Sequence, residues 1–241
     1  MRFFATFAKN ISLTNLHLRF ACGNKYPIMA DNYLENRYDA VFGKPSKKVI
    51  LKPAGKSIDV LLRRNRSYRG YKKEQIITES QLKKIVEVNT CVPSARNQQV
   101  LRFKLVTRDT GAEHVLKHIV LGGALPELHL PLEGTEPEAF IVVCSIVPET
   151  RMVSIDMGIS VQSMLLKATE MGLNGIIIGA FDKEAVKQAL HLPYDPSLIV
   201  AIGKGNETIQ CVPIHWQESH NYYRQNNVHY VPKVIIDDLI L

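Results

Sequence analysis

The sequence predicts one α+β or α/β domain, because segments with strand-like and helix-like patterns alternate along it. Short runs of apolar, mostly β-branched residues indicate covered strands at 103–106, 140–144, 176–178 and 198–202. Segments with apolar residues at helical spacing lie between them. Of the 241 residues, 46% are hydrophobic and 22% are charged, which is typical of a globular protein and excludes a disordered or fibrous chain.

The first 28 residues contain four basic residues and no acidic one, in a chain with a net charge of +7. They contain neither the long apolar stretch of a secretory signal nor a small-x-small cleavage site, although their composition resembles that of a transit peptide. We interpret 1–28 as an extension that need not belong to the working protein. Residues 29–56 are then expected to form an N-terminal helix, within 31–42, and a connector.

Helix and loop signals organise the rest of the chain. An apolar stripe at 57–66 leads into the basic run 63–69, and the Thr-Glu-Ser-Gln capping box at 78–81 predicts the start of a helix. Residues 122–137 are rich in Gly and Pro, which predicts a loop or lid. The segment 154–171 is apolar on almost every side, which indicates a helix that is buried or lies in a subunit contact.

Local signals after this apolar helix predict how the chain continues. Gly172 is expected to end the helix, and Asn174–Gly175 to form a turn before the next strand. Asp182 is expected to cap a further helix. No internal repeat is visible along the chain.

Several function classes lack their sequence signatures. No apolar run approaches the roughly 18–20 residues that span a bilayer. The four cysteines are far apart, so we expect no disulfide framework, no cysteine-based zinc site and a reducing, cytoplasmic location. His114 and His118 have a metal-ligand spacing without an HExxH motif, so a solvated helix face is favoured and no metal is predicted. The GxSxG, GxGxxG and P-loop motifs are also absent.

The residues that carry candidate chemistry are a basic cluster and a loop. The cluster contains forked guanidinium donors beside a hydroxyl, which suits a phosphate monoester, although a solvated surface would show the same composition. The loop, Pro93–Gln99, combines proline, small residues and amides, which permits close approach of the backbone to a flat ligand. The cluster consists of Arg63, Arg64, Arg66, Ser67 and Arg69.

Together these pieces resemble the nitroreductase family of FMN-dependent oxidoreductases, over about residues 58–241. Residues 66–69 are similar to the family's Arg-Arg-Ser-x-Arg motif, and 93–103 to its Pro-Ser-x-x-Asn-x-Gln-Pro…Phe loop. Residues 156–179 resemble its central helix and flavin-face strand, and 231–233 a carboxy-terminal phosphate-binding segment. The resemblance implies a mixed central sheet flanked by helices in a domain spanning 57–241, and an intertwined homodimer with FMN at the interface.

The resemblance also implies roles for individual residues. Arg69 would lie near the pyrimidine edge of the flavin, and the backbone N–H of Gly179 or Ala180 would point at flavin N5, so Arg69 and Gly179 are the expected catalytic groups. The chain departs from the family pattern at Asn65, Val100 and Val234, and Arg63, Arg64 or Lys204 could supply the missing charge. The expected FMN ligands are Arg64, Arg66, Ser67, Arg69, Pro93, Ser94, Ala95, Asn97, Gln99, Ile177, Ile178, Gly179, Ala180 and Lys233.

The function that this resemblance implies is an oxidoreductase that takes hydride from NADH or NADPH and reduces nitroaromatic, quinone-like or other electron-poor acceptors by a ping-pong mechanism. The expected partners are a second copy of the chain and a small-molecule acceptor, with no nucleic acid and no membrane. Alternatives are a family member with another flavin reaction, such as reductive dehalogenation or flavin fragmentation, and a flavin-binding dimer without turnover. A basic nucleic-acid-binding module remains a further alternative.

Overall fold

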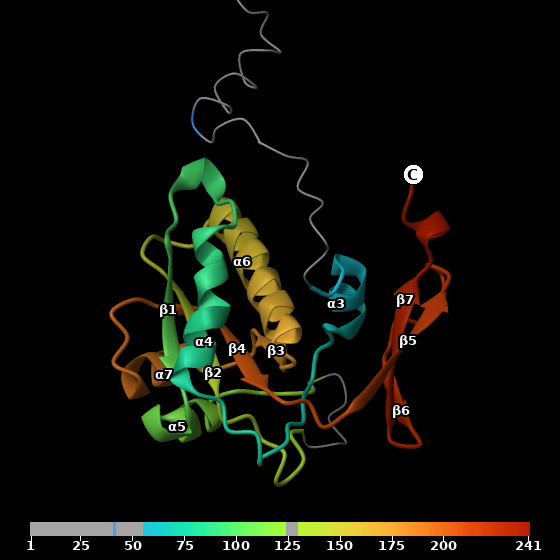
Figure 1. Ribbon diagram of the computed structural model, residues 1–241, viewed down its shortest axis with the longest axis horizontal. Helices are drawn as coiled ribbons and strands as arrows, with labels where there is room; N and C mark the ends of the chain where they lie inside the picture. The colour runs from blue at the N-terminus through green and yellow to red at the C-terminus, as the bar shows by residue number, and fades with distance from the viewer. Residues whose placement is uncertain (1–40, 42–54, 124–129) are drawn as a thin grey trace, which may run out of the picture. The chain divides into compact units, whose positions relative to one another are not determined.

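The computed structural model describes Val41, residues 55–123 and residues 130–241. The helices and strands discussed below all lie in the unit Pro53–Leu241 (Figure 1). The expected extension at 1–28, the helix within 31–42 apart from Val41, and most of the connector lie outside the described residues. The boundaries that we assign to these segments therefore stay predictions.

A four-stranded sheet forms the centre of this unit, in the order β1-β2-β4-β3, with antiparallel pairing between each pair of neighbours. The two inner strands are buried along most of their length, which explains their continuous apolar sequences. A parallel bridge between Ser67 and Gly175 adds a neighbour at the free edge of β3, so the sheet is mixed as expected. The strands are β1 (Leu101–Val106), β2 (Phe140–Ser145), β3 (Asn174–Ile178) and β4 (Pro196–Gly203).

Helices cover both faces of this sheet. Alternate side chains of β2 point to opposite sides: Ile141 packs into one apolar cluster with α4 and α6, and Phe140 into another with α5 and α7 (Figure 1). This two-sided core confirms the α+β class. The helices are α3 (Ile58–Arg64), α4 (Glu79–Val86), α5 (Ala112–Leu116), α6 (Arg151–Glu170) and α7 (Lys183–Ala189).

The capping signals read from the sequence are confirmed. Thr78 caps α4 through a reciprocal capping box with Gln81, and Asp182 caps α7 by accepting from the backbone of Ala185. Gly172, with φ of 80°, follows the end of α6, where only a residue that tolerates a left-handed conformation is unstrained.

Two expectations for this region need correction. Helix α6 begins at Arg151, three residues before the predicted start, because the Thr150 hydroxyl accepts from the Val153 N–H and caps it there. Asn174 and Gly175 form no turn but are the first residues of β3. A Cβ on Gly175 would lie 2.6 Å from the carbonyl oxygen of Ala201, so glycine is required here by the close approach of two strands.

A second, three-stranded sheet follows β4, in the order β5-β7-β6. Strands β5 and β7 pair in parallel, whereas β6 and β7 form an antiparallel pair. The sheet brings carboxy-terminal side chains to the segment that follows α3, because residues of β5 and β7 line a cavity with that segment. The strands are β5 (Thr208–Ile214), β6 (Tyr223–Gln225) and β7 (Val228–Val234).

Candidate functional site

Five of the residues that the sequence singles out line one cavity of about 300 Å³, which we call the arginine cavity. They come from the segment after α3, from β3 and from β7. The wall also includes Gln162 and Leu165 of α6. The five residues are Arg66, Ser67, Arg69, Ile177 and Lys233.

The segment 65–69 runs extended beside β3, and this explains where its side chains point. The Tyr68 N–H donates to the Gly175 carbonyl at 3.2 Å, next to the bridge between Ser67 and Gly175. Side chains of an extended segment alternate between two sides. Ser67 and Arg69 therefore line the arginine cavity, whereas Tyr68 lines a different cavity and the long side chain of Arg66 reaches both.

The guanidinium of Arg66 is held by the chain itself. Its Nε donates to the Asn65 carbonyl at 2.6 Å, and one Nη donates to the Leu62 carbonyl at 2.7 Å. The other Nη contacts Cys211 Sγ at 3.0 Å. Arg66 thus ties the end of α3 to β5, and it keeps only part of its donors for a ligand.

Arg69 is the most buried cation of the cavity, with 9% of its surface exposed. One Nη donates to the Ser67 carbonyl at 3.2 Å, and the guanidinium carbon lies 4.9 Å from the centre of the Tyr222 ring. Its Nε has no hydrogen-bond partner among the described residues. Because an unpaired buried donor costs free energy, this atom points to a ligand that supplies an acceptor.

A buried carboxylate behind the cavity positions the backbone of Arg69. Glu207 accepts from the N–H of Arg69 at 2.5 Å and from the N–H of Gly70 at 3.2 Å, and it pairs with Arg224. Its side chain is only 8% exposed. Sequence reasoning missed Glu207 and Arg224, because neither belongs to a local motif and only the second sheet brings them to Arg69.

His229 of β7 is a further cavity residue that the sequence did not indicate. Its ring lies 5.1 Å from the Tyr222 ring, and Nδ1 has no hydrogen-bond partner in the described part of the chain. Burial, followed by the charges of Arg69 and Arg224, lowers the pKa of His229 below its ordinary 6.5, while Glu207 acts in the opposite direction. We therefore expect a neutral imidazole at pH 7.

This pKa predicts how stability depends on pH. The folded state binds a proton at His229 less readily than the unfolded state does, so the unfolded state gains protons first as the pH falls below 6.5. We expect the free energy of unfolding to decrease over that range, and His229→Gln to remove this part of the decrease. Urea unfolding between pH 5 and 8 measures it, with exposed His220→Gln as the control. Identical pH profiles for wild type and His229→Gln would contradict the assignment.

The predicted loop lines a separate cavity of about 370 Å³, which we call the loop cavity. Pro93, Ser94 and Gln99 contribute to it, together with residues of α4, β1 and α6. No residue lines both the loop cavity and the arginine cavity. Within one copy of the chain, the two groups of predicted ligands are thus not brought together.

The loop backbone is unusual, because three residues other than glycine have left-handed conformations. Arg96, Asn97 and Gln99 have φ between 50° and 54°. One tertiary and one local contact hold the loop in this shape: the Ala95 N–H donates to the buried Asp156 at 2.8 Å, and the Gln99 side-chain amide donates to Asn97 Oδ1 at 3.1 Å. Such conformations persist only where surrounding contacts enforce them, and they cluster at functional sites.

The other predicted ligands lie elsewhere. Arg64 lines a neighbouring cavity rather than the arginine cavity. The side chain of Ile178 is 2% exposed and packs in the core, so only its backbone is available to a ligand. Gly179 and Ala180 follow β3 and are exposed.

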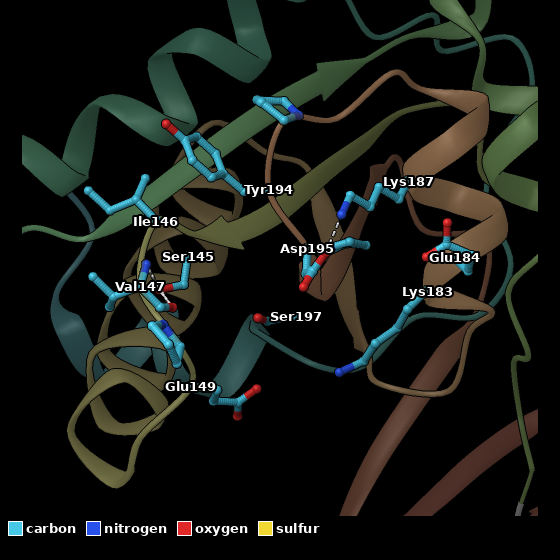
Figure 2. Close-up of a pocket in the computed structure, with 13 residues that line it drawn as sticks. Ser145, Ile146, Val147, Glu149, Lys183, Glu184, Lys187, Tyr194, Asp195 and Ser197 are labelled. Carbon is cyan, nitrogen blue, oxygen red and sulfur yellow. Dashed lines mark hydrogen bonds and ion pairs between the residues drawn. The ribbon is translucent and has the colours of Figure 1, made fainter.

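A further cavity, of about 670 Å³, lies near the ends of β2 and α7 and contains none of the predicted ligands (Figure 2). Two of the residues that line it, Lys187 and Asp195, form an ion pair at 2.5 Å. This pair raises the pKa of Lys187 and lowers that of Asp195, which keeps both charged at neutral pH. Such a pair is an ordinary feature of a solvated surface.

The described residues contain neither a metal-binding cluster nor a membrane-spanning helix. Within 55–123 and 130–241, no cluster of three or more His, Cys, Asp or Glu side chains is arranged to hold a metal ion. His114 is about half exposed and lies 3.5 Å from the Glu113 carboxylate. No helix in the described part of the chain has the length and apolar character needed to cross a membrane.

Residues 147–204, which contain α6, β3, α7 and β4, match the model of the nitroreductase family. No curated protein matches the chain. A nitroreductase family protein from Streptococcus pneumoniae TIGR4 has a similar structure, with a TM-score of 0.52 and 17% identity over 64% of this chain and 93% of that one.

Two further solved structures show the same similarity. One, from Exiguobacterium sibiricum 255-15, is in complex with FMN; it has a TM-score of 0.52 and 18% identity over 63% of this chain and 90% of that one. The other, from Sphigopyxis sp. strain HMH, is an FMN- and NADPH-dependent nitroreductase with a TM-score of 0.51 and 18% identity over 63% and 89%. The chain therefore has the nitroreductase fold, and its match to the nitroreductase family over residues 147–204 confirms the resemblance that its motifs indicate.

Proposed function

We propose that the protein is an FMN-dependent oxidoreductase that takes hydride from NADH or NADPH and reduces an electron-poor small molecule. The observation that carries this proposal is the arginine cavity, in which a buried guanidinium with an unpaired Nε stands beside the exposed amine of Lys233. Two similar solved structures contain or depend on FMN, and one of these proteins uses NADPH. Bound FMN would supply the hydride chemistry, whereas the protein supplies binding and electrostatics.

The residues present suit such a ligand. Arg69 and Lys233 provide positive charge for oxyanions, and Arg69 Nε and His229 Nδ1 are buried atoms that lack partners among the described residues. Ile177, which is 43% exposed, presents an apolar surface on the same wall. The fixed charge of Arg69 favours negative charge that develops on a ligand in this low-dielectric site, and no metal ligand is required for that role.

The arginines of the basic run line two cavities, whereas a nucleic-acid-binding module needs one continuous basic surface. Arg63 and Arg64 line one cavity, Arg69 lines the other, and Arg66 lines both. This division supports a small-molecule site. The free thiols of Cys91, Cys144 and Cys211 are consistent with the cytoplasmic location that we propose.

A homodimer is part of the proposal, because one copy of the chain does not bring the predicted ligands together. The strained loop 93–99 and the arginine cavity can contact one ligand if the loop comes from a second copy. Met152 and Ile155 of α6 are 49% and 45% exposed, which leaves apolar surface for such a contact. We further propose that NADH or NADPH and the electron acceptor bind the same site one after the other, which gives ping-pong kinetics.

Flavin binding is the first test. The purified protein is expected to be yellow, or to bind added FMN with a saturable change in the flavin spectrum, and to oxidise NADH or NADPH when an acceptor such as a quinone is present. Protein that stays colourless and ignores added FMN would overturn the proposal. Flavin binding without turnover would instead support the non-catalytic alternative.

Complementation between two inactive variants tests the shared site. Arg69→Met removes a cavity cation, and Asn97→Gly removes a loop amide while tolerating the φ of 54°. If each site combines the cavity of one copy with the loop of the other, mixed dimers contain one intact site and regain activity. Mixing that restores nothing, or a protein that sediments only as a monomer, would refute the shared site.

A further inference from the structure

A second cavity, of about 360 Å³, lies next to the arginine cavity and shares Arg66 and Ile209 with it. Five cations line it, and no aspartate or glutamate is among its described lining residues. We call it the basic cavity. Its cations come from the residue before the N-cap of α3, from the last turn of α3, from the segment after it and from the residue after β4, and they are Lys56, Arg63, Arg64, Arg66 and Lys204.

Little in the described chain neutralises these charges. The side chains of Lys56, Arg63 and Arg64 form no hydrogen bond or ion pair with another described residue. Lys204 donates to the Gly172 carbonyl at 2.9 Å, a bond to a neutral group. Glu170, in the last turn of α6, is already paired with Lys167 at 2.6 Å.

Helix dipoles account for only part of the charge. The carboxy-terminal ends of α3 and α6 both lie at this cavity, since Arg64 and Gly172 line it. Each helix end carries about half a negative charge, so the two together offset roughly one of the five cations. An excess of this size, gathered around one open cavity, favours a bound polyanion.

We propose that the basic cavity binds a small molecule that carries at least two phosphate groups. Arginine presents a planar fork of donors that matches phosphate oxygens, and two arginines here have no other described partner. The volume is within the range of about 300–1,000 Å³ found for small-molecule sites. The ring of Tyr68, packed against Gly205, forms an apolar wall on which an attached base can lie.

Two sources have this chemistry: a free diphosphate, and the phosphorylated half of a dinucleotide. The dinucleotide source rests on the proposed oxidoreductase function. It is structurally reasonable because Arg66 and Ile209 line both the basic and the arginine cavity, which makes the two cavities direct neighbours. Binding of a free diphosphate, in contrast, does not require that the protein bind flavin.

Calorimetric titration of the full chain with pyrophosphate, adenosine 2′,5′-bisphosphate and adenosine distinguishes these sources. We expect saturable binding of both phosphorylated probes, and none of adenosine. Tighter binding of the bisphosphate than of pyrophosphate identifies the dinucleotide source, and the reverse identifies the free diphosphate. Absence of saturable binding of either phosphorylated probe at 0.15 M salt would overturn the proposal.

A matched pair of variants locates the site. Arg63→Gln with Arg64→Gln removes two cavity charges, and Lys83→Gln with Lys84→Gln removes two exposed charges from α4. We expect the first variant to bind the phosphorylated probes at least tenfold more weakly, and the control to match wild type. Lys56→Gln, outside any helix, should also weaken binding. Equal losses in the α3 variant and the control would overturn the proposal, as would a random DNA oligonucleotide that binds more tightly than either probe.

The binding test also stands apart from the flavin test. FMN content is measured on each sample before titration. A protein that binds pyrophosphate but no FMN would refute the oxidoreductase proposal while supporting this one. A protein that binds FMN and oxidises NADH or NADPH, but binds neither phosphorylated probe, would support the oxidoreductase proposal and refute this one.

Discussion

Replacing Glu207 by glutamine is expected to lower the free energy of unfolding by about 3 kcal/mol. The substitution removes the charge that faces Arg224 in a site where the Glu207 side chain is 8% exposed. Losing one partner of a buried ion pair is costly, because it leaves the other charge desolvated and uncompensated. The backbone N–H groups of Arg69 and Gly70 also lose a charged acceptor for a neutral one.

Urea unfolding followed by circular dichroism measures this loss. Glu113→Gln on α5 is the matched control, because Glu113 is 70% exposed, and we expect it to change stability by less than about 0.5 kcal/mol. Adding Arg224→Met to Glu207→Gln should restore part of the stability, since it removes the unpaired cation but returns no charge to the two N–H groups. If Glu207→Gln and Glu113→Gln are equally stable, Glu207 does not organise the cavity.

Arg69→Met is expected to weaken FMN binding by about 2–3 kcal/mol, or roughly 30- to 150-fold, because it removes a charged donor from a desolvated site. The flavin-free protein should retain its stability to within about 1 kcal/mol. The variant loses the contact between Arg69 and Tyr222, which stabilises the wild type by about 0.5–1 kcal/mol. It also loses the cost of burying a cation next to Arg224 and His229, and this offsets the lost contact.

Fluorescence titration of flavin-free protein with FMN measures the affinity, and thermal unfolding of the same samples measures the fold. Arg151→Met is the control, because Arg151 is an exposed cation that lines none of the cavities described above. An unchanged FMN affinity in Arg69→Met would show that this guanidinium is not a ligand. A second readout is the pKa of His229, which should rise when the Arg69 charge is removed.

Several elements of the fold were predictable because their causes are local. The capping box at Thr78, the cap at Asp182 and the stop at Gly172 depend on residues within one turn of each other. The apolar segments at 140–144 and 198–202 could be assigned to covered strands from composition alone, and they are the buried inner strands of the sheet. Asn174–Gly175 was misassigned, because the local turn signal gave no information about the Ala201 carbonyl that requires the glycine.

The candidate site was predictable only in part. Arg66, Ser67 and Arg69 were identified from one short motif, and Lys233 from a resemblance, and all four line the arginine cavity. Glu207, Arg224 and His229 were not identified, because they are far apart in the carboxy-terminal part of the chain and none has a local signature. Whether Pro93–Gln99 meets this cavity in a second copy stays a prediction.

By itself, the sequence determined the class of the fold, the caps of its helices and the presence of an arginine-rich segment beside a hydroxyl. These features depend on periodicity and on neighbours a few residues apart. Only the tertiary structure decided that the arginines line two cavities, because α3 ends at Arg64 and the chain then runs extended beside β3 as far as Arg69. It also decided that a carboxylate 138 residues away holds Arg69 in place, a contact that sheet pairing creates and that no sequence spacing indicates.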